Sequence, residues 1–393
     1  MGLGYIGLPT AALIASKKIH VHGVDINKKV VDTINKGKIH IVEPDLEGLV
    51  HFGVRQEYLV AALLPKKADV FLIAVPTPFK GEHIPDTTYV EKATKMVIPF
   101  LREGNLFILE STSPVGTTEK LAKLIFGERP ELKDKIFISY CPERVLPGSV
   151  IHELQHNDRV IGGINGKSTD AAVTFYARFV KGELHRTNAK TAEMCKLTEN
   201  AYRDVNIAFA NELSIICDKA GINVNELISL ASKHPRVEIL KPGPGVGGHC
   251  IAVDPWFIVS DFKDEAKIIR QARMTNNYKR EWVIGKIKNA ASEFRKKNKR
   301  AAVIACMGLA YKPDIDDLRE SPAFEIVQDL LKMKYNVLAS EPNVSHHPGI
   351  QLTDSARAVR QADIIVFLVA HKEFKRLALK KEKVVLDYCG VRN

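Results

Sequence analysis

Short apolar segments alternate with amphipathic ones through residues 1–190, and this alternation is the strongest constraint on how the chain folds. Four of these segments are β-rich and end in turn or polar residues: IHVHGVD (19–25), DVFLIAVP (69–76), LFILEST (106–112) and IFISYCP (136–142). Helical patterns lie between them, as at 27–37 and 87–104. Continuous apolar strands separated by helices are typical of a parallel, doubly wound α/β sheet.

The pattern changes near residue 190 and changes back near residue 299. Residues 191–221 and 264–298 carry long helical patterns, interrupted by a loop rich in glycine and proline at 240–257. Strand-like segments return from residue 301. We therefore predict two Rossmann-like doubly wound domains, 1–190 and 299–393, joined by a central helical domain over 191–298.

Composition excludes several classes of protein. The 393 residues are 45% hydrophobic and 26% charged, as in ordinary globular domains, and they contain neither a long apolar run nor a signal-peptide pattern. The six cysteines are widely spaced without a CxxC pair, so we expect no metal site, no disulfide scaffold and a cytoplasmic location. The net charge of +11 suits a pyrophosphate ligand, and the basic segments lack the aromatic residues that nucleic-acid binding favours.

A glycine pattern at the start of the chain predicts a dinucleotide site. Gly2, Gly4 and Gly7 have the GxGxxG spacing, and the loop that they form includes Tyr5 and Ile6. Asp25 ends the next strand about 20 residues on, where an acidic side chain binds a ribose hydroxyl and favours NAD over NADP. The alternative is a simple terminal turn, with Asp25 capping the helix that follows.

Only Met1 precedes this loop, although such a loop normally follows a buried strand. We expect the 393-residue chain to be shortened at its start, so that the N-terminal domain lacks its first strand. The alternative is a non-catalytic nucleotide-binding remnant, which the retained chemical residues described below disfavour.

Later loops end strands at the same edge of the predicted sheet, where ligands bind. Pro76 and Thr77 follow one strand, and Thr112 follows the next. These residues are candidates to line the nicotinamide side of the site. The alternative is ordinary turn chemistry, which also favours proline and threonine.

The segment GPGVGGHCIAVDPWF (243–257) carries the clearest sign of reaction chemistry. Four glycines and two prolines surround Cys250, and Asp254 follows four residues later. Glycines permit close approach of a ligand to a thiol. Beside an NAD site, a thiolate adds to an aldehyde, and the thiohemiacetal loses hydride to become a thioester that water cleaves. A purely structural, buried cysteine is the alternative, as we expect for Cys217 and Cys306.

Several blocks together resemble the UDP-glucose/GDP-mannose dehydrogenase family nearly end to end. These blocks are GLGYIGLP, VPTP, ESTSPVGTT, CPERVLPG, NDRVIGG, AEMCKLTENAYRDVNIAFANE, GPGVGGHCIAVDPWF and KPDIDDLRESPA. The resemblance implies a four-electron oxidation of a sugar nucleotide with two NAD and a catalytic cysteine. It also implies a homodimer or larger homo-oligomer.

The resemblance assigns roles to individual residues. The implied catalytic residues are Cys250, Lys196, Asn200, Asp254, Glu143 and Thr112. The implied substrate contacts are Glu143, Arg144, Lys196, Asn200, Arg236, Gly247, Lys312 and Arg319. Lys196 and Asn200 are four residues apart and so share one face of a helix. Lys312 and Arg319 would face the pyrophosphate, although ion pairs with nearby carboxylates are the alternative for both.

Departures within the blocks point to the branch that acts on 2-acetamido sugars. UDP-glucose enzymes have serine where this chain has His249, and a second acidic residue where it has Pro147. Their cross-subunit arginine matches His234, so the contact assigned to Arg236 is an approximate match. The implied substrate is UDP-N-acetyl-D-mannosamine, oxidised for surface polysaccharide synthesis. The alternatives are UDP-N-acetylglucosamine or UDP-glucose, or a two-electron hydroxyacid-type dehydrogenase, which would not need Cys250.

Overall fold

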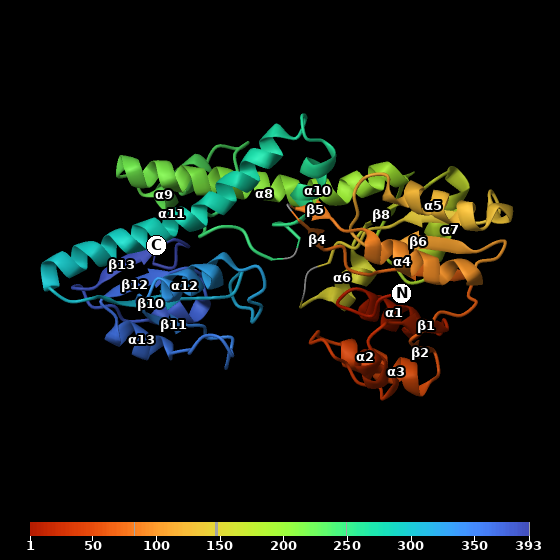
Figure 1. The fold of residues 1–393 in the computed structure, drawn as a ribbon, viewed down its shortest axis with the longest axis horizontal. Coiled ribbons are helices and arrows are strands. Elements are labelled where there is room, and N and C mark those ends of the chain that lie inside the picture. The colour runs from red at the N-terminus through yellow and green to blue at the C-terminus, as the bar shows by residue number, and fades with distance from the viewer. Residues whose placement is uncertain (82, 146–147, 249, 393) are drawn as a thin grey trace. The chain divides into compact units, whose positions relative to one another are not determined.

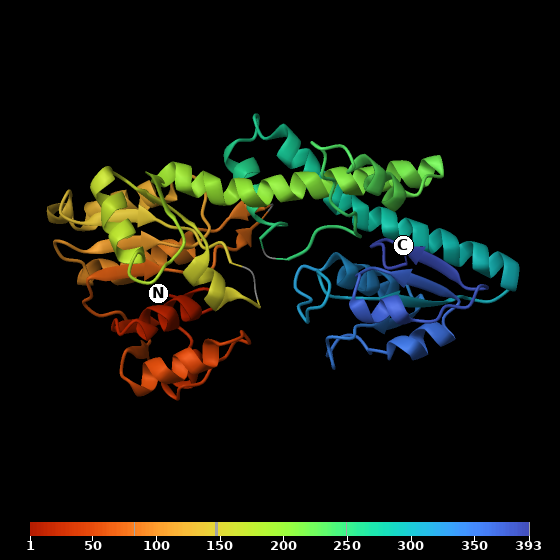
Figure 2. The same ribbon diagram turned by 180° about the vertical axis from the view of Figure 1, so that it is seen from behind.

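The computed structural model describes residues 1–81, 83–145, 148–248 and 250–392, and it consists of two compact units (Figures 1 and 2). The first unit is Met1–Glu199 and the second is Asn200–Asn393. Helix α8 (Ala189–Ala220) begins in the first unit and ends in the second. The two units are described separately below. Pro147 and His249 lie outside the described residues.

Parallel strands form most of the first unit. A five-stranded sheet has the order β3–β6–β7–β8–β9, in which only the β7–β8 pair is antiparallel among the described strands. A second, two-stranded sheet pairs β1 with β2, and β4 pairs with β5 in a short hairpin. The strands are β1 (Val21–Val24), β2 (Leu59–Ala62), β3 (Val70–Ile73), β4 (Phe79–Lys80), β5 (Ile84–Pro85), β6 (Leu106–Leu109), β7 (Phe137–Tyr140), β8 (Arg159–Gly163) and β9 (Leu184–Asn188).

Helices cover both faces of the five-stranded sheet. The helices of this unit are α1 (Gly7–Ser16), α2 (Lys28–Asn35), α3 (Leu46–Arg55), α4 (Thr88–Val97), α5 (Thr117–Glu128), α6 (Val150–His156) and α7 (Gly166–Tyr176), with 3₁₀ turns at Ile98–Phe100 and Pro130–Leu132. Alternate residues of β6 show the arrangement, because successive side chains point to opposite faces. Phe107 and Leu109 pack with α4 and α5, whereas Leu106 and Ile108 pack with α1, α6 and α7.

Met1 and Gly2 lie between the two sheets of the first unit. The Met1 nitrogen donates to the Leu72 carbonyl at 2.8 Å, and the Met1 carbonyl accepts from Ala74 at 2.9 Å. The Gly2 nitrogen donates to Val24 of β1 at 2.8 Å. A cavity of about 220 Å³ lies between β1 and β3 beside these residues. The expectation of a strand before Met1 stays a prediction.

The second unit contains a four-stranded parallel sheet of order β11–β10–β12–β13. Its strands are β10 (Val303–Met307), β11 (Asn336–Ser340), β12 (Ile364–Phe367) and β13 (Val384–Asp387). Its helices are the end of α8, α9 (Val224–Ala231), α10 (Asp254–Asp261), α11 (Lys267–Asn298), α12 (Pro322–Lys332) and α13 (Ser355–Gln361), with a 3₁₀ turn at Lys372–Arg376. Helices α11 and α12 cover one face of the sheet, and α13 covers the other (Figure 1).

The predicted α/β fold class with a long central helix is confirmed, and the three domain ranges stay a prediction. Every strand segment named from the sequence contains an observed strand, and the long patterns at 191–221 and 264–298 correspond to α8 and α11. The loop at 240–257 is shorter than predicted, because its last residues from Asp254 form the first turn of α10. No described helix has both the length and the apolar character needed to span a membrane.

A buried carboxylate joins α8 to the start of α5 within the first unit. Glu193 accepts hydrogen bonds from the Gly116 nitrogen, the Thr118 nitrogen and the Thr118 hydroxyl, at 2.5, 2.8 and 2.7 Å. Its side chain is fully buried. A carboxylate at a helix N-terminus satisfies amide groups that have no partner inside the helix and interacts favourably with the helix dipole.

We predict that Glu193→Ala lowers the free energy of unfolding by about 2–4 kcal/mol, because it leaves buried amide donors unpaired. Urea unfolding followed by circular dichroism measures this change. Glu119→Ala is the matched control, because Glu119 lies in the first turn of α5 and also contacts α8, through an exposed ion pair with Lys190. Equal losses in the two variants would contradict the structural role assigned to Glu193.

Candidate active site

The glycine loop of the first unit has the close contacts that a dinucleotide site requires. A Cβ atom on Gly7 would lie 1.9 Å from the Gly2 carbonyl oxygen, and one on Gly2 would lie 2.5 Å from the Ala74 oxygen. A Cβ on Gly4 would meet no atom within 4 Å, so the middle of the loop is open. Helix α1 begins at Gly7, and its N-terminal amides are suited to a phosphate.

Asp25 ends β1 and holds the same loop. Its carboxylate accepts from the Leu3 nitrogen and from the Asn27 nitrogen, each at 2.9 Å. The alternative that Asp25 caps the next helix is wrong, since the cap of α2 is Asn27. A carboxylate with two remaining lone-pair directions beside an open glycine loop fits the ribose of a dinucleotide.

Two further loops meet at the carboxyl ends of β3 and β6, as the sequence predicts. The Thr77 hydroxyl donates to the Thr112 carbonyl at 2.7 Å, and the Ser111 hydroxyl donates to the Val75 carbonyl at 2.7 Å. These cross-loop bonds place Pro76, Thr77 and Thr112 on the same edge of the sheet as the glycine loop.

Glu143 is held by a buried arginine that sequence analysis did not single out. Arg159, the first residue of β8, lies 2.9 Å from the Glu143 carboxylate. The other Glu143 oxygen accepts from the Arg144 nitrogen at 2.7 Å. The Arg144 side chain pairs with Glu199 of α8 at 3.0 Å. Glu143 therefore sits in a fixed orientation rather than on a mobile side chain.

Arg159 also faces a second buried acid, Glu110, at 3.9 Å. The Tyr176 hydroxyl donates to Glu110 at 2.7 Å. Burial raises the pKa of Glu110 to about 7, although the Arg159 charge opposes this shift. The sequence does carry a signal for Glu110, because this acid directly follows the apolar residues of β6. A side chain at such a position points into the core.

Lys196 and Asn200 both lie on α8 and are both buried, as the four-residue spacing predicts. In the described part of the chain, the Lys196 ammonium has no hydrogen-bond acceptor or carboxylate partner. The Asn200 amide donates to the Asp254 carboxylate at 2.6 Å. Asp254 is therefore fixed at the first residue of α10, within the second unit.

Cys250 is an exposed thiol that directly precedes α10. Its carbonyl accepts from the nitrogens of Val253 and Asp254, at 3.1 and 2.8 Å. The alternative of a core cysteine is wrong for Cys250, whereas Cys217 and Cys306 are buried as expected. The backbone thus links the thiol position to the first turn of the helix that carries Asp254.

The glycines before Cys250 pack against the loop that follows β10. A Cβ on Gly247 would lie 2.4 Å from the Glu320 oxygen and 2.9 Å from the Tyr311 Cβ. A Cβ on Gly248, where φ is +83°, would lie 3.0 Å from the Tyr311 ring. Only glycine fits at these positions, so the reactive loop and the loop with Lys312 are neighbours within the second unit.

A polar network missed by the sequence analysis supports the same loop. Asp204 of α8 pairs with Arg273 of α11 at 2.7 Å, and Asn276 donates to Asp204 at 2.8 Å. Asn211 donates to Asn276 at 2.9 Å and accepts from the Gly243 nitrogen at 2.9 Å. The reactive loop therefore begins at a residue tied to both long helices.

The remaining predicted substrate residues differ in their surroundings. Arg319 pairs with Asp317 at 2.6 Å, the ion pair that sequence analysis held open as an alternative. Lys312 is half-buried in the same loop. Arg236 is exposed beyond the end of α9, where its nitrogen donates to His234.

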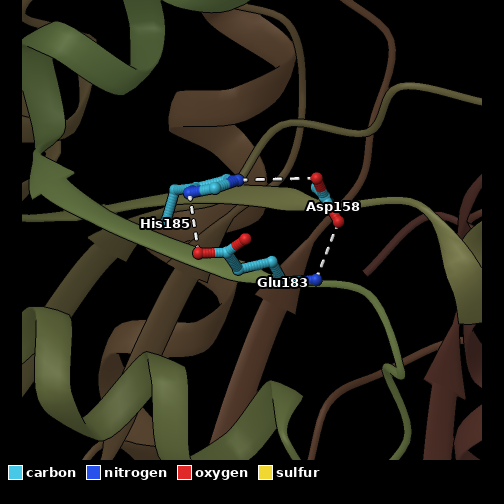
Figure 3. A group of neighbouring side chains, drawn as sticks. All are labelled: Asp158, Glu183 and His185. Carbon is cyan, nitrogen blue, oxygen red and sulfur yellow. Dashed lines mark hydrogen bonds and ion pairs between the residues drawn. The ribbon is translucent and has the colours of Figure 1, made fainter.

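A group of ionisable side chains on the surface of the first unit lies apart from these residues (Figure 3). Asp158 accepts from the Glu183 nitrogen at 2.8 Å, and His185 lies 3.5 Å from Asp158 and 3.7 Å from Glu183. All three are exposed. The hydrogen bond from the Glu183 amide lowers the pKa of Asp158. These contacts account for the grouping, so we assign no site to it.

Comparison with known proteins places these residues in context. Three family models match: UDP-glucose/GDP-mannose dehydrogenase family, NAD binding domain (residues 1–180), central domain (190–278) and UDP binding domain (305–393). The chain is 55% identical to a UDP-N-acetyl-D-mannosamine dehydrogenase of Campylobacter jejuni, over 99% of this chain and 98% of the relative. It is 52% identical to an NDP-N-acetyl-D-galactosaminuronic acid dehydrogenase of Ralstonia nicotianae, over 100% of this chain and 95% of that relative.

A solved structure is similar over the whole chain. It is that of a UDP-D-ManNAc dehydrogenase from Pyrococcus horikoshii, with a TM-score of 0.89 and 38% identity. The comparison covers 100% of this chain and 95% of that one. The NAD-binding family domain agrees with the fit of the glycine loop and Asp25 to a dinucleotide.

We predict that Glu110 makes the stability of the protein fall as the pH rises from about 5 to 7. The folded-state pKa is about 7, above the ordinary 4.5, so the folded state retains a proton that the unfolded state has lost in this window. The effect reaches about 3 kcal/mol above pH 7.

Glu110→Gln imitates the protonated carboxyl, so it is expected to reduce this pH dependence and to be more stable than the wild type at pH 8. Urea unfolding at pH 5, 6, 7 and 8 measures both effects. Glu128→Gln, an exposed site on α5, is the control. A pH dependence of full wild-type size in Glu110→Gln would show that another group is responsible.

Proposed function

The chain belongs to the UDP-glucose/GDP-mannose dehydrogenase family, and we propose that it oxidises C6 of UDP-N-acetyl-D-mannosamine to the carboxylate in two steps. The observation that carries the proposal is the exposed Cys250 at the start of α10, next to the fixed Asn200–Asp254 pair. A two-electron dehydrogenase needs no thiol at this position. The choice of sugar follows the relatives named above.

The thiol divides the second oxidation into steps that balance. The C6 alcohol first loses a proton and a hydride to become an aldehyde. The Cys250 sulfur then bonds to the aldehyde carbon, and the thiohemiacetal loses a second hydride to become a thioester. Water cleaves the carbon–sulfur bond, which releases the carboxylate and restores the thiol. NAD, when bound by Gly2, Gly4, Tyr5, Ile6, Gly7, Asp25, Pro76, Thr77 and Thr112, supplies a hydride acceptor for each oxidation.

The other residues act by charge and orientation in this proposal. Lys196 is buried and has no carboxylate partner among the described residues, so it is suited to stabilise the negative charge that develops on the substrate oxygen. Asn200 is fixed by Asp254 and offers further polar contact. Glu143, oriented by Arg159, is the candidate base for thioester hydrolysis, and Thr112 is assigned to the nicotinamide side.

We assign substrate binding to residues from all three family domains. Arg144 and Arg236 are the proposed cations outside the UDP-binding family domain, and Lys312 is the proposed pyrophosphate contact within it. Arg319 joins Lys312 once its bond with Asp317 opens or is shared. Gly247 is the remaining proposed substrate contact, at a position where only glycine fits against the loop after β10.

We extend the proposal to domain organisation and setting. The domains are 1–190, which binds NAD, 191–298, which carries the reactive loop, and 299–393, which binds UDP. We place the protein in a reducing cytoplasm, because its six cysteines are widely spaced and form no CxxC pair. The product class suits surface polysaccharide synthesis.

An N-acetylgalactosamine nucleotide is the second candidate substrate. The Ralstonia relative favours it, because its identity to this chain is within a few per cent of that of the Campylobacter protein. The two sugars differ only in hydroxyl and acetamido configuration, which pocket shape distinguishes.

We predict two NADH per sugar with UDP-N-acetyl-D-mannosamine, and much slower turnover with the UDP derivatives of N-acetylglucosamine, N-acetylgalactosamine and glucose. Absorbance at the NADH band and mass spectrometry of the acid measure both quantities. Cys250→Ala is expected to form almost no acid, with a loss of at least about a thousandfold for a covalent nucleophile. One NADH per sugar, or acid formed readily by Cys250→Ala, would refute the thioester route.

Helix α8 supplies the surface that we propose for homodimer formation. Tyr202, Phe209 and Ile216 are 69%, 55% and 53% exposed and recur every seven residues, so they form one stripe along the helix. Met274 and Tyr278 of α11 are also half exposed. Apolar stripes of this kind mark interaction surfaces.

We predict that Phe209→Glu converts the dimer to a monomer, because it places a charge within an apolar interface. Light scattering after size-exclusion chromatography measures the mass. Leu331→Glu is the control, because Leu331 is also partly exposed but lies on α12. An unchanged mass for Phe209→Glu would place the interface elsewhere.

A further inference from the structure

Two fully buried polar side chains, His371 and Glu341, lie at one edge of the sheet in the second unit. Glu341 directly follows β11, and His371 follows β12 after a short turn. Their side chains have no exposed surface, and the His371 Nε2 lies 3.0 Å from a Glu341 oxygen. Buried polar groups of this kind are costly unless they are hydrogen-bonded, so their partners indicate what they do.

The hydrogen bonds of His371 define which ring nitrogen carries the proton. The Asp314 backbone nitrogen donates to Nδ1 at 3.0 Å, and the Asn343 amide lies 3.1 Å from the same atom. A backbone N–H can only donate, so Nδ1 must offer a lone pair. The proton of the neutral ring is therefore on Nε2, which donates to Glu341. The ring thus links the two residues, because Nδ1 accepts from Asp314 and Nε2 donates to Glu341.

Glu341 holds the beginning of the same loop. One of its oxygens accepts from the nitrogens of Leu309 and Ala310, at 2.7 and 3.0 Å. Burial favours a higher pKa for Glu341, but the bonds from His371 and Leu309 outweigh it and lower the pKa. Glu341 is consequently an acceptor for the first residues of the loop that follows β10.

Lys312 lies between these two attachments. Leu309 and Ala310 are held by Glu341, and Asp314 is held by His371 in a left-handed conformation with φ of 61°. The Asp314 carboxylate also accepts from the Lys372 nitrogen at 3.1 Å. The residues before Lys312 are thereby bound to Glu341 after β11, and Asp314 beyond it is bound to the turn after β12.

The loop also contacts the reactive loop, as the close approach of Tyr311 to Gly247 and Gly248 shows. A displacement of the loop would therefore move Lys312 and the neighbours of Cys250 together. A cation site made of Asp314, His371 and Glu373 is a competing explanation of this cluster. It does not fit, because the Nδ1 lone pair already accepts from N–H donors.

We propose that His371 and Glu341 are positioning residues that hold Lys312 for the pyrophosphate of the UDP-sugar. The inference rests on the proposed function, since that function assigns Lys312 to the pyrophosphate. His371 and Glu341 do not contact the substrate in this account. They set the affinity for UDP through the shape of the loop over residues 309–319.

Three variants and direct titration with UDP test this inference. His371→Leu removes both ring bonds, and His371→Asn keeps an oxygen near the Nδ1 position that accepts from Asp314. Glu341→Gln weakens the acceptor for Leu309 and Ala310. His347→Leu makes the same chemical change elsewhere in the unit, where His347 accepts from the Gly349 nitrogen and makes an edge-to-face contact with Phe324.

The expected result for His371→Leu is about tenfold weaker UDP binding by calorimetry and a similar rise in KM for the UDP-sugar, since a buried bond network is lost. KM for NAD is expected to stay within about twofold, and His371→Asn is expected to recover part of the UDP affinity. Glu341→Gln is expected to weaken UDP binding, and His347→Leu to leave it unchanged.

The inference, but not the proposed function, would be overturned if His371→Leu bound UDP with near wild-type affinity. If that variant does not fold, near wild-type affinity in both His371→Asn and Glu341→Gln would have the same meaning. Parallel loss of NAD and UDP affinity together with a lower Tm would also overturn it, because it would indicate general destabilisation. Absence of UDP binding in the wild-type protein would overturn the proposed function as well.

Discussion

The buried ion pair between Asp204 and Arg273 is the interaction on which the second unit depends, because it joins α8 to α11 inside the core. A buried pair of charges is more stable when its other donors and acceptors are also bonded. Asn276 donates to Asp204 and Asn211 links Asn276 to the Gly243 nitrogen, whereas Asp204 Oδ2 and Arg273 Nε have no hydrogen-bond partner among the described residues. The start of the reactive loop is therefore set by the packing of two long helices. The Asn200–Asp254 bond holds the far end of the same loop, so Cys250 lies in a segment fixed on both sides.

The first unit depends on a different constraint, which is close backbone approach. Gly2 and Gly7 leave no space for a side chain, whereas Gly4 faces open space. This contrast explains why a dinucleotide loop needs glycine for two reasons, a tight turn and access for the ligand. Arg159 lies beside two buried acids, Glu110 and Glu143, and fixes Glu143, so the side chain of the candidate base is part of the core rather than of a surface loop.

Much of the fold was predictable because buried strands and long helices leave strong periodic patterns. Segments such as 106–112 and 264–298 matched β6 and α11 closely, whereas β8 and the edge strand β9 were not singled out. Strand β9 is largely exposed, and β8 begins with the charged Arg159, so neither reads as a continuous apolar run. Gly2, Gly4, Gly7, Asp25 and Cys250 could be named as candidates because glycine spacing and a thiol among glycines are local signals, and their roles stay predictions. For Arg319, the structure shows the alternative that the sequence left open, an ion pair with a nearby carboxylate, because Arg319 pairs with Asp317.

Sequence by itself determined the α/β class, the two long helices, the family and the residue types available for hydride and thiol chemistry, because each of these is written in local spacing. Tertiary structure alone decided which polar groups are buried together. Glu110 with Arg159, Asp204 with Arg273, and His371 with Glu341 are separated by 30 to 69 residues along the chain. Their partners come from different elements that meet only after the sheets and helices pack, so no local pattern identifies them. The loop with Lys312 takes its shape from such a pair, as the reactive loop takes its shape from another.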